Sequence, residues 1–308
     1  MNLELVGSVL NEAWNAGRRT KVQMLTAIGA SIAGFLTVSH LFHVPDCAGF
    51  GGSLLGQSSP VVSIIVVAVT LLGCVLISTL IAGSVRFDAG LLCGLIGMAA
   101  LSVRSGTMGD VLRQSSAAGP TIFIHFALEL VLLYALVAVA WSLLWGLHVN
   151  GHLKADEFRD GVEDTDEPMP FKVSALAMQV GVMALFVMLF GQTDAKTQVM
   201  ASIGIASFIG AIAAYYMYPI SPSPWLWIGP MIVGVVGYAL AYFGVGAGEE
   251  WKTGQLSFSL APLARALPLD YATAGPAGAI LGYWMSRKWH RQRLDEGSSA
   301  ESVEIVGD

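Results

Sequence analysis

Charged residues are scarce in this chain. They make up 12% of its 308 residues, whereas hydrophobic residues make up 55% and the mean hydropathy is +0.65. A water-soluble domain carries about 25% charged residues, because it needs a solvated surface. The composition therefore excludes an ordinary soluble fold. It predicts an all-α protein whose helices cross a membrane several times.

Several sequence motifs are also absent. The chain has no Walker phosphate loop, no GxGxxG turn, no HExxH, no GxSxG and no CxxC. Its three cysteines do not make a disulfide framework, and it has no ladder of arginines of the kind that senses voltage. The net charge is −6 without a basic stripe, which argues against a nucleic-acid partner. We predict no cofactor and no catalytic residue.

Long apolar segments, by contrast, are frequent. A bilayer core of about 30 Å needs roughly 20 apolar residues of helix, and residues 61–83 meet this length without a single charge. Eight segments qualify or come close: residues 22–41, 61–83, 89–103, 121–147, 173–191, 199–218, 225–246 and 271–286. The third and the eighth are weak, because 15 or 16 residues of helix cover only about 22–24 Å.

The placement of Lys and Arg predicts that both termini lie in the cytoplasm. With eight spans, eleven of these residues fall on the cytoplasmic side (Arg18, Arg19, Lys21, Arg86, Lys154, Arg159, Lys172, Arg287, Lys288, Arg291, Arg293) and five on the other (Arg104, Arg113, Lys196, Lys252, Arg265). An alternative with six spans and two re-entrant segments gives thirteen against three. We favour eight spans, because residues 89–103 are apolar throughout and neither weak segment has an obvious second limb. The prediction is a multi-pass protein of the cytoplasmic (inner) cell membrane.

Three hydrophilic regions flank or divide the spans. Residues 1–21 have apolar positions at helical spacing and are predicted to form an amphipathic interfacial helix, not a cleaved signal peptide. Residues 148–172 form an acidic cytoplasmic loop between two groups of four spans, residues 22–147 and 173–286. Residues 287–308 begin as a basic juxtamembrane stretch and end in an acidic tail for which we expect disorder.

The candidate functional residues at membrane depth are His125 and Glu129 in the fourth span. They are four residues apart and so share one side of a helix. Ionisable groups inside membranes commonly mark proton or ion pathways, although a neutral packing pair is the alternative. We expect both side chains to face the bundle interior, with His125 holding a neutral Glu129 by a hydrogen bond.

A weaker candidate is a metal site at the outer end of the first span. It would use His40, His43, Asp46 and Cys47, whose side chains are all of metal-ligating types. No second ligand pair with motif spacing occurs elsewhere in the sequence.

Small residues recur at the spacing that lets helices pack closely. Gly90 and Gly94 form a G-x-x-x-G motif in the third span, and Gly278 and Gly282 form another in the eighth. They predict packing within the bundle or between protein copies. Gly-Pro pairs at residues 229–230 and 275–276 predict kinks or late helix starts.

Three classes of function are compatible with these features. The favoured class is a non-catalytic membrane component, such as a subunit, an assembly factor or an organiser of a complex, with the lipid bilayer and protein partners around it. The alternative is a small-solute or proton-coupled transporter or channel that uses His125 and Glu129. An intramembrane enzyme is the third class, and it is disfavoured because membrane catalysts usually gather more ionisable residues than this chain has at depth.

Overall fold

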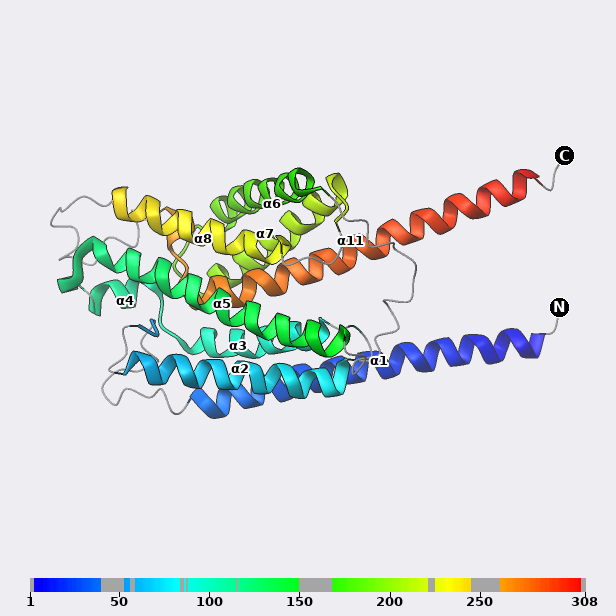
Figure 1. Cartoon of the computed structure of the whole chain (residues 1–308), viewed down its shortest axis with the longest axis horizontal. Helices are drawn as coiled ribbons and strands as arrows, with labels where there is room; N and C mark the ends of the chain where they lie inside the picture. Colours follow the sequence, from blue (N-terminus) through cyan, green and yellow to red (C-terminus); the bar gives the residue numbers. More distant parts are fainter. Residues whose placement is uncertain are drawn as a thin grey trace. The chain divides into compact units, whose positions relative to one another are not determined.

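The computed structural model describes residues 3–39, 53–55, 59–83, 86, 88–114, 116–149, 168–220, 225–244 and 261–305. Within these ranges the chain is helical and contains no strand (Figure 1). The all-α class predicted from the composition is therefore confirmed. The contacts divide the chain into two units, which are described separately: residues 1–106 with 131–163, and residues 107–130 with 164–308.

The first unit is built on three helices that all pack against one another. These helices are α1 (Leu3–Ser39), α2 (Pro60–Ala82) and α3 (Ala89–Arg104). The hydroxyls of Ser31 and Ser78 lie 2.7 Å apart between α1 and α2, and Arg104 donates a hydrogen bond to Ser39 at 2.9 Å. The predicted interfacial segment of residues 1–21 is not a separate element, because α1 is one continuous helix from Leu3.

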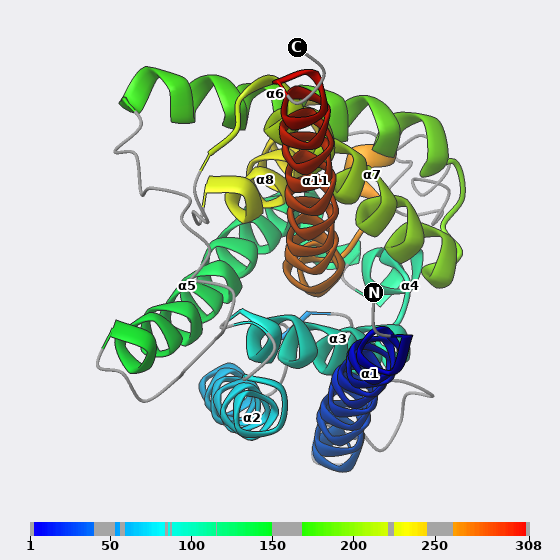
Figure 2. The same cartoon turned by 90° about the vertical axis from the view of Figure 1, so that its right-hand side faces the viewer.

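The second unit is a larger helical bundle. Its elements are α4 (Met108–Gln114), η2 (Ser116–Thr121), the beginning of α5 (Ile122–Val149), α6 (Met169–Phe190), α7 (Lys196–Met217), α8 (Trp225–Gly244), η4 (Pro262–Ala264) and α11 (Pro268–Ile305). Figure 2 shows α11 end-on between α7 and α8, and α11 packs most extensively along α7. Helix α6 covers α7 and α8 from the other side.

Within the described residues, six helices are long and apolar enough to cross a membrane. They comprise residues Arg19–Ser39, Pro60–Ala82, Gly119–Leu147, Met169–Phe190, Lys196–Met217 and Trp225–Gly244. Helix α3 is a shorter apolar helix. The predicted eighth segment, residues 271–286, forms part of the first half of α11.

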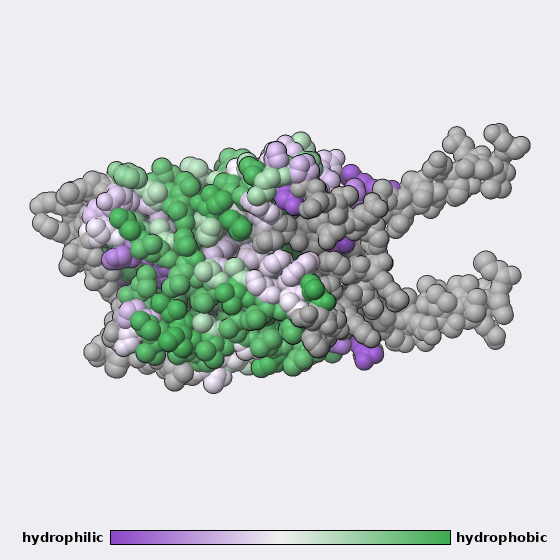
Figure 3. Space-filling model, viewed as in Figure 1, coloured by the Kyte–Doolittle hydropathy of each residue, from purple (hydrophilic) through white to green (hydrophobic). Residues whose placement is uncertain are grey.

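The distribution of side chains on α2 is the reverse of that in a water-soluble helix. Ile65, Val69 and Leu80 point outward, and Leu80 is 84% exposed, whereas Ser78 and Thr79 are buried. Apolar side chains cover α2 in the face drawn in Figure 3. Large exposed apolar surfaces are unfavourable in water, but they are what lipid contact requires. The pattern therefore supports a membrane environment.

The two weak candidate spans of the sequence consist mostly of buried residues. Eleven of the 16 residues of α3 are buried. In α11, nearly every residue from Pro268 to Ile280 is buried as well. A helix that is surrounded by protein does not need a long apolar surface toward lipid. The burial of these two segments therefore explains why their apolar runs are short.

The glycines of the two G-x-x-x-G motifs lie where α3 and α11 contact their neighbouring helices. An added Cβ atom at Gly94 would lie 2.5 Å from the Cγ2 of Val75 in α2. At Gly90 it would lie 2.9 Å from the carbonyl oxygen of Val75. At Gly278 and Gly282 it would meet the backbone of α7. The glycines thus allow α3 and α11 to approach their neighbours at backbone distance.

Both α1 and α11 are longer than a bilayer core is thick. Their 37 and 38 residues correspond to about 55 Å of helix. Within its own unit, each extends well beyond the neighbouring helices (Figure 1). Helix α11 continues through residues 294–305, for which the sequence had suggested disorder.

Candidate functional site

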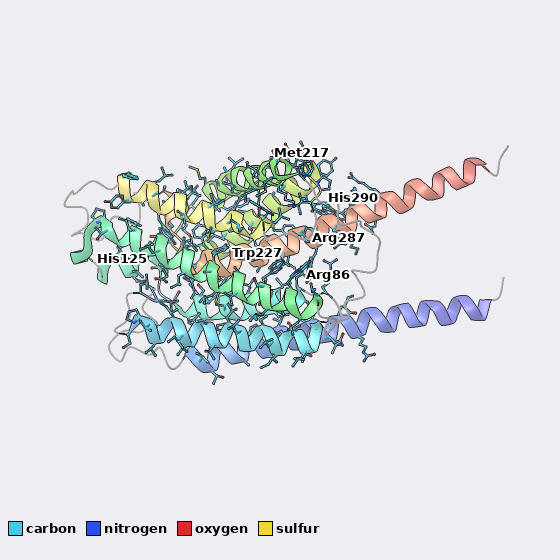
Figure 4. The ribbon with its side chains drawn as sticks, viewed as in Figure 1. Arg86, His125, Met217, Trp227, Arg287 and His290 are labelled. Carbon is cyan, nitrogen blue, oxygen red and sulfur yellow. The ribbon has the colours of Figure 1, made fainter. Side chains whose placement is uncertain are left out.

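The structure separates the two residues of the predicted intramembrane pair. Glu129 is buried, with 1% of its surface exposed, whereas His125 is exposed (Figure 4). The prediction that both side chains face the bundle interior was therefore wrong for His125. Four residues turn a helix by about 400°, so His125 lies about 40° around α5 from Glu129. That offset is enough to cross the boundary of the buried face, which Phe126 and Leu130 define.

Two buried tyrosines lie in the interior of the second unit, and Tyr238 is the one near Glu129. Tyr238 of α8 is fully buried, interacts electrostatically with Glu129, and packs its ring 5.7 Å from that of Phe126. The ring of Tyr271 in α11 lies edge-on to that of Tyr238, with centroids 6.3 Å apart. Glu129 thus lies near an aromatic contact between α8 and α11.

The tyrosine hydroxyls hold the segment that precedes α11. The hydroxyl of Tyr238 donates a hydrogen bond to the carbonyl oxygen of Ala266, and that of Tyr271 donates to the carbonyl oxygen of Leu263, both at 2.7 Å. Because this segment is not part of a long helix, its carbonyl oxygens need hydrogen-bond donors from elsewhere. The two tyrosines supply them from neighbouring helices.

An ion pair joins the first turns of α7 and α11. The Nζ atom of Lys196 lies 2.7 Å from Oδ1 of Asp270, and the two side chains are 12% and 1% exposed. The other carboxylate oxygen of Asp270 accepts a hydrogen bond from the backbone N–H of Leu267 at 2.9 Å. Asp270 therefore both caps α11 and neutralises Lys196, whose position at a helix N-terminus is otherwise unfavourable.

Arg265 extends this charged cluster to the connection between α6 and α7. Its guanidinium donates hydrogen bonds to the carbonyl oxygens of Gly191 and Gln192, the first at 3.3 Å. It also lies 3.9 Å from the carboxylate of Asp194. Asp194, Asp270, Lys196 and Arg265 carry two negative and two positive formal charges, so this cluster is neutral when all four are ionised.

A second polar contact occurs in the middle of α6. Gln179 is fully buried, and its amide donates a hydrogen bond to the carbonyl oxygen of Leu226 in α8. In a regular helix this carbonyl would accept from residue 230, but Pro230 has no N–H. Gly229 makes room for the amide, since an added Cβ there would lie 2.8 Å from Gln179. Gln179 thus replaces the hydrogen bond that Pro230 removes.

The other candidate positions cannot be placed in the structure. His40, His43, Asp46 and Cys47 lie outside the described residues, as do residues 150–167 of the acidic loop. Among the described residues, no group of three or more His, Cys, Asp or Glu side chains could hold a metal ion.

Sequence reasoning identified Glu129 but missed its surroundings. Its neighbour Tyr238 and the separate Lys196–Asp270 ion pair come from helices far away in the chain, and none of these residues belongs to a local motif. Gln179 had a weak signal, because it is a polar residue in the middle of an apolar span.

Comparison with known proteins finds no matching family model, no similar curated protein and no similar solved structure. The geometry of this chain is therefore the evidence for its function.

Proposed function

We propose that the chain is a non-catalytic component of a membrane, with eight spans and both termini in the cytoplasm. The observation that carries this proposal is the use of its buried polar side chains. Gln179, Tyr238 and Tyr271 each donate to a backbone carbonyl of another element, and Ser207 in α7 donates to the carbonyl oxygen of Gly275 in α11 at 2.7 Å. These groups hold helices together and leave a rigid unit for partners to assemble on.

The contact between α7 and α11 supports the same conclusion. A carrier that works by alternating access must move one group of helices against another. Here Gly278 and Gly282 bring α11 against the backbone of Gly204 and Phe208 in α7, and the Lys196–Asp270 ion pair joins the ends of the two helices. Interlocked backbones and a buried ion pair oppose sliding within this unit.

The test is the composition of the native complex. The full chain, tagged and purified in mild detergent from its own membrane, should carry partner chains in fixed stoichiometry in intact-complex mass spectrometry. A bare monomer or homo-oligomer that transports a solute in proteoliposomes would overturn the proposal.

A second candidate function is proton-coupled transport through Glu129. It is favoured by one observation, namely a carboxyl group with 1% exposure inside a predicted span and beside Tyr238. Intramembrane carboxyl groups are commonly functional.

The variant Glu129→Gln separates the two functions. It preserves shape and hydrogen bonding but cannot carry a proton, so a transporter should lose proton flux in proteoliposomes while its melting temperature stays unchanged. For a structural role we expect no effect of Glu129→Gln in either assay, whereas Glu129→Lys should lower expression. His125→Gln is the matched control, because His125 is exposed on the same helix.

A further inference from the structure

A groove opens between the end of α7 and the part of α11 that follows Ser286. It encloses about 470 Å³, within the range of small-molecule binding sites. One wall is formed by Ile212, Tyr216 and Pro219, and the other by Trp289, His290 and Arg293. Figure 4 shows His290 on α11, one turn after Arg287.

The side chains of Arg293 and His290 in the groove lie against aromatic rings. The guanidinium carbon of Arg293 lies 5.5 Å from the centre of the Tyr216 ring. The ring of His290 stands edge-on to that of Tyr215, with centroids 6.3 Å apart. Among the described side chains, no carboxylate forms an ion pair with either residue. The groove therefore presents positive charge that is positioned by aromatic contacts and available to an anion.

The groove also lies at the level where α11 changes character. Its apolar segment ends at Ser286, and Arg287, Lys288, Arg291 and Arg293 follow within the next two turns. Trp and Tyr prefer the boundary between hydrocarbon and headgroups, where basic residues meet the phosphates of anionic lipids. Tyr216 and Trp289 are 68% and 48% exposed, so the groove faces the surroundings of the protein.

We infer that this groove binds one anionic phospholipid. Its phosphate is held by Arg293 and His290, and the beginning of an acyl chain lies along Ile212, Tyr216 and Trp289. Charge complementarity favours an anionic headgroup, and the apolar wall favours a lipid over a free phosphate ion. This inference goes beyond the proposed function and does not depend on whether the chain is a subunit or a transporter.

The experiment is tryptophan quenching in phosphatidylcholine vesicles that contain the full chain and a small fraction of brominated lipid. Bromine on the acyl chains of phosphatidylglycerol should quench Trp289 more strongly than bromine on phosphatidylcholine. Trp289→Phe should remove this difference. Arg293→Gln should weaken the preference for the anionic lipid about tenfold, the order expected for one charge-assisted hydrogen bond.

Lys288→Gln is the matched control. It removes one positive charge at the same level of α11, and Lys288 is exposed and does not line the groove. An equal loss of preference in Lys288→Gln would show general surface attraction and overturn the site. If bromine on phosphatidylglycerol quenches Trp289 no more than bromine on phosphatidylcholine, whereas inorganic phosphate changes the Trp289 emission, the groove is a phosphate site and the lipid is refuted. Should Arg293→Gln fail to fold, His290→Gln provides the same comparison with an expected loss of several-fold.

Discussion

The contact between α7 and α11 allows a sharp prediction for Gly278. Replacing this glycine with alanine adds one methyl group. The new Cβ would collide with the carbonyl oxygen of Gly204 and lie 3.2 Å from the backbone nitrogen of Phe208. Neither atom belongs to a flexible side chain, so the collision can be relieved only by moving α11 away from α7.

The expected cost follows from two opposing terms. Overpacking a closely packed interface costs about 1–3 kcal/mol, whereas alanine is better than glycine in a helix by about 0.5–1 kcal/mol. We expect a net destabilisation of about 1–2 kcal/mol, which for a domain of this size lowers the melting temperature by about 2–8 °C. Gly282→Ala should behave similarly, because its Cβ would meet the carbonyl oxygen of Phe208.

Gly181→Ala is the matched control on α6. An added Cβ there has no atom within 4 Å, so only the helix-propensity term applies. This variant should melt at the same temperature as the wild type or slightly higher. The assay is intrinsic tryptophan fluorescence during heating in detergent, which reports on Trp225, Trp227 and Trp284 of the second unit. If Gly278→Ala melts as late as Gly181→Ala, the close approach of α7 and α11 is refuted.

Two further predictions concern the α6–α8 contact and the topology. Gln179→Leu should lower the free energy of unfolding by about 1–3 kcal/mol, because it leaves the carbonyl oxygen of Leu226 without a donor. The loss of stability should be smaller in a Pro230→Ala background, where the helix can supply the N–H. Equal losses in both backgrounds, measured by thermal melting, would contradict the compensation. A cysteine introduced at Asp160 should resist an impermeant thiol reagent in intact cells. Native Cys47, which lies on the opposite side in the eight-span topology, should react. Labelling at position 160 would contradict that topology.

The sequence predicted the long helices well, because an uninterrupted apolar run of about 20 residues has few alternatives. Residues 61–83 were expected to span, and α2 covers Pro60–Ala82. The polar extensions of α1 and α11 were less predictable. Hydropathy places the end of a membrane helix where the apolar residues stop. A helix can continue into water when the residues that follow have sufficient helix propensity.

The candidate site was predictable only in part. The presence of Glu129 in an apolar span indicated a buried group, and its burial is observed. The four-residue spacing to His125 suggested a common environment, but spacing specifies an angle around a helix and not the width of the buried face. Its neighbour Tyr238 is more than 100 residues away in the chain, and such long-range contacts leave no local pattern.

The two weak spans show what hydropathy measures. Residues 89–103 and 271–286 are short and rich in small residues, which made their crossing of the membrane doubtful, and most residues of both segments are buried. A helix that faces lipid must be long and apolar, whereas a helix that faces protein needs close packing, for which Gly94 and Gly278 are suited. Weak hydropathy together with G-x-x-x-G spacing therefore indicates a central helix as readily as a re-entrant one. In this chain the glycines are the evidence that favours the central position.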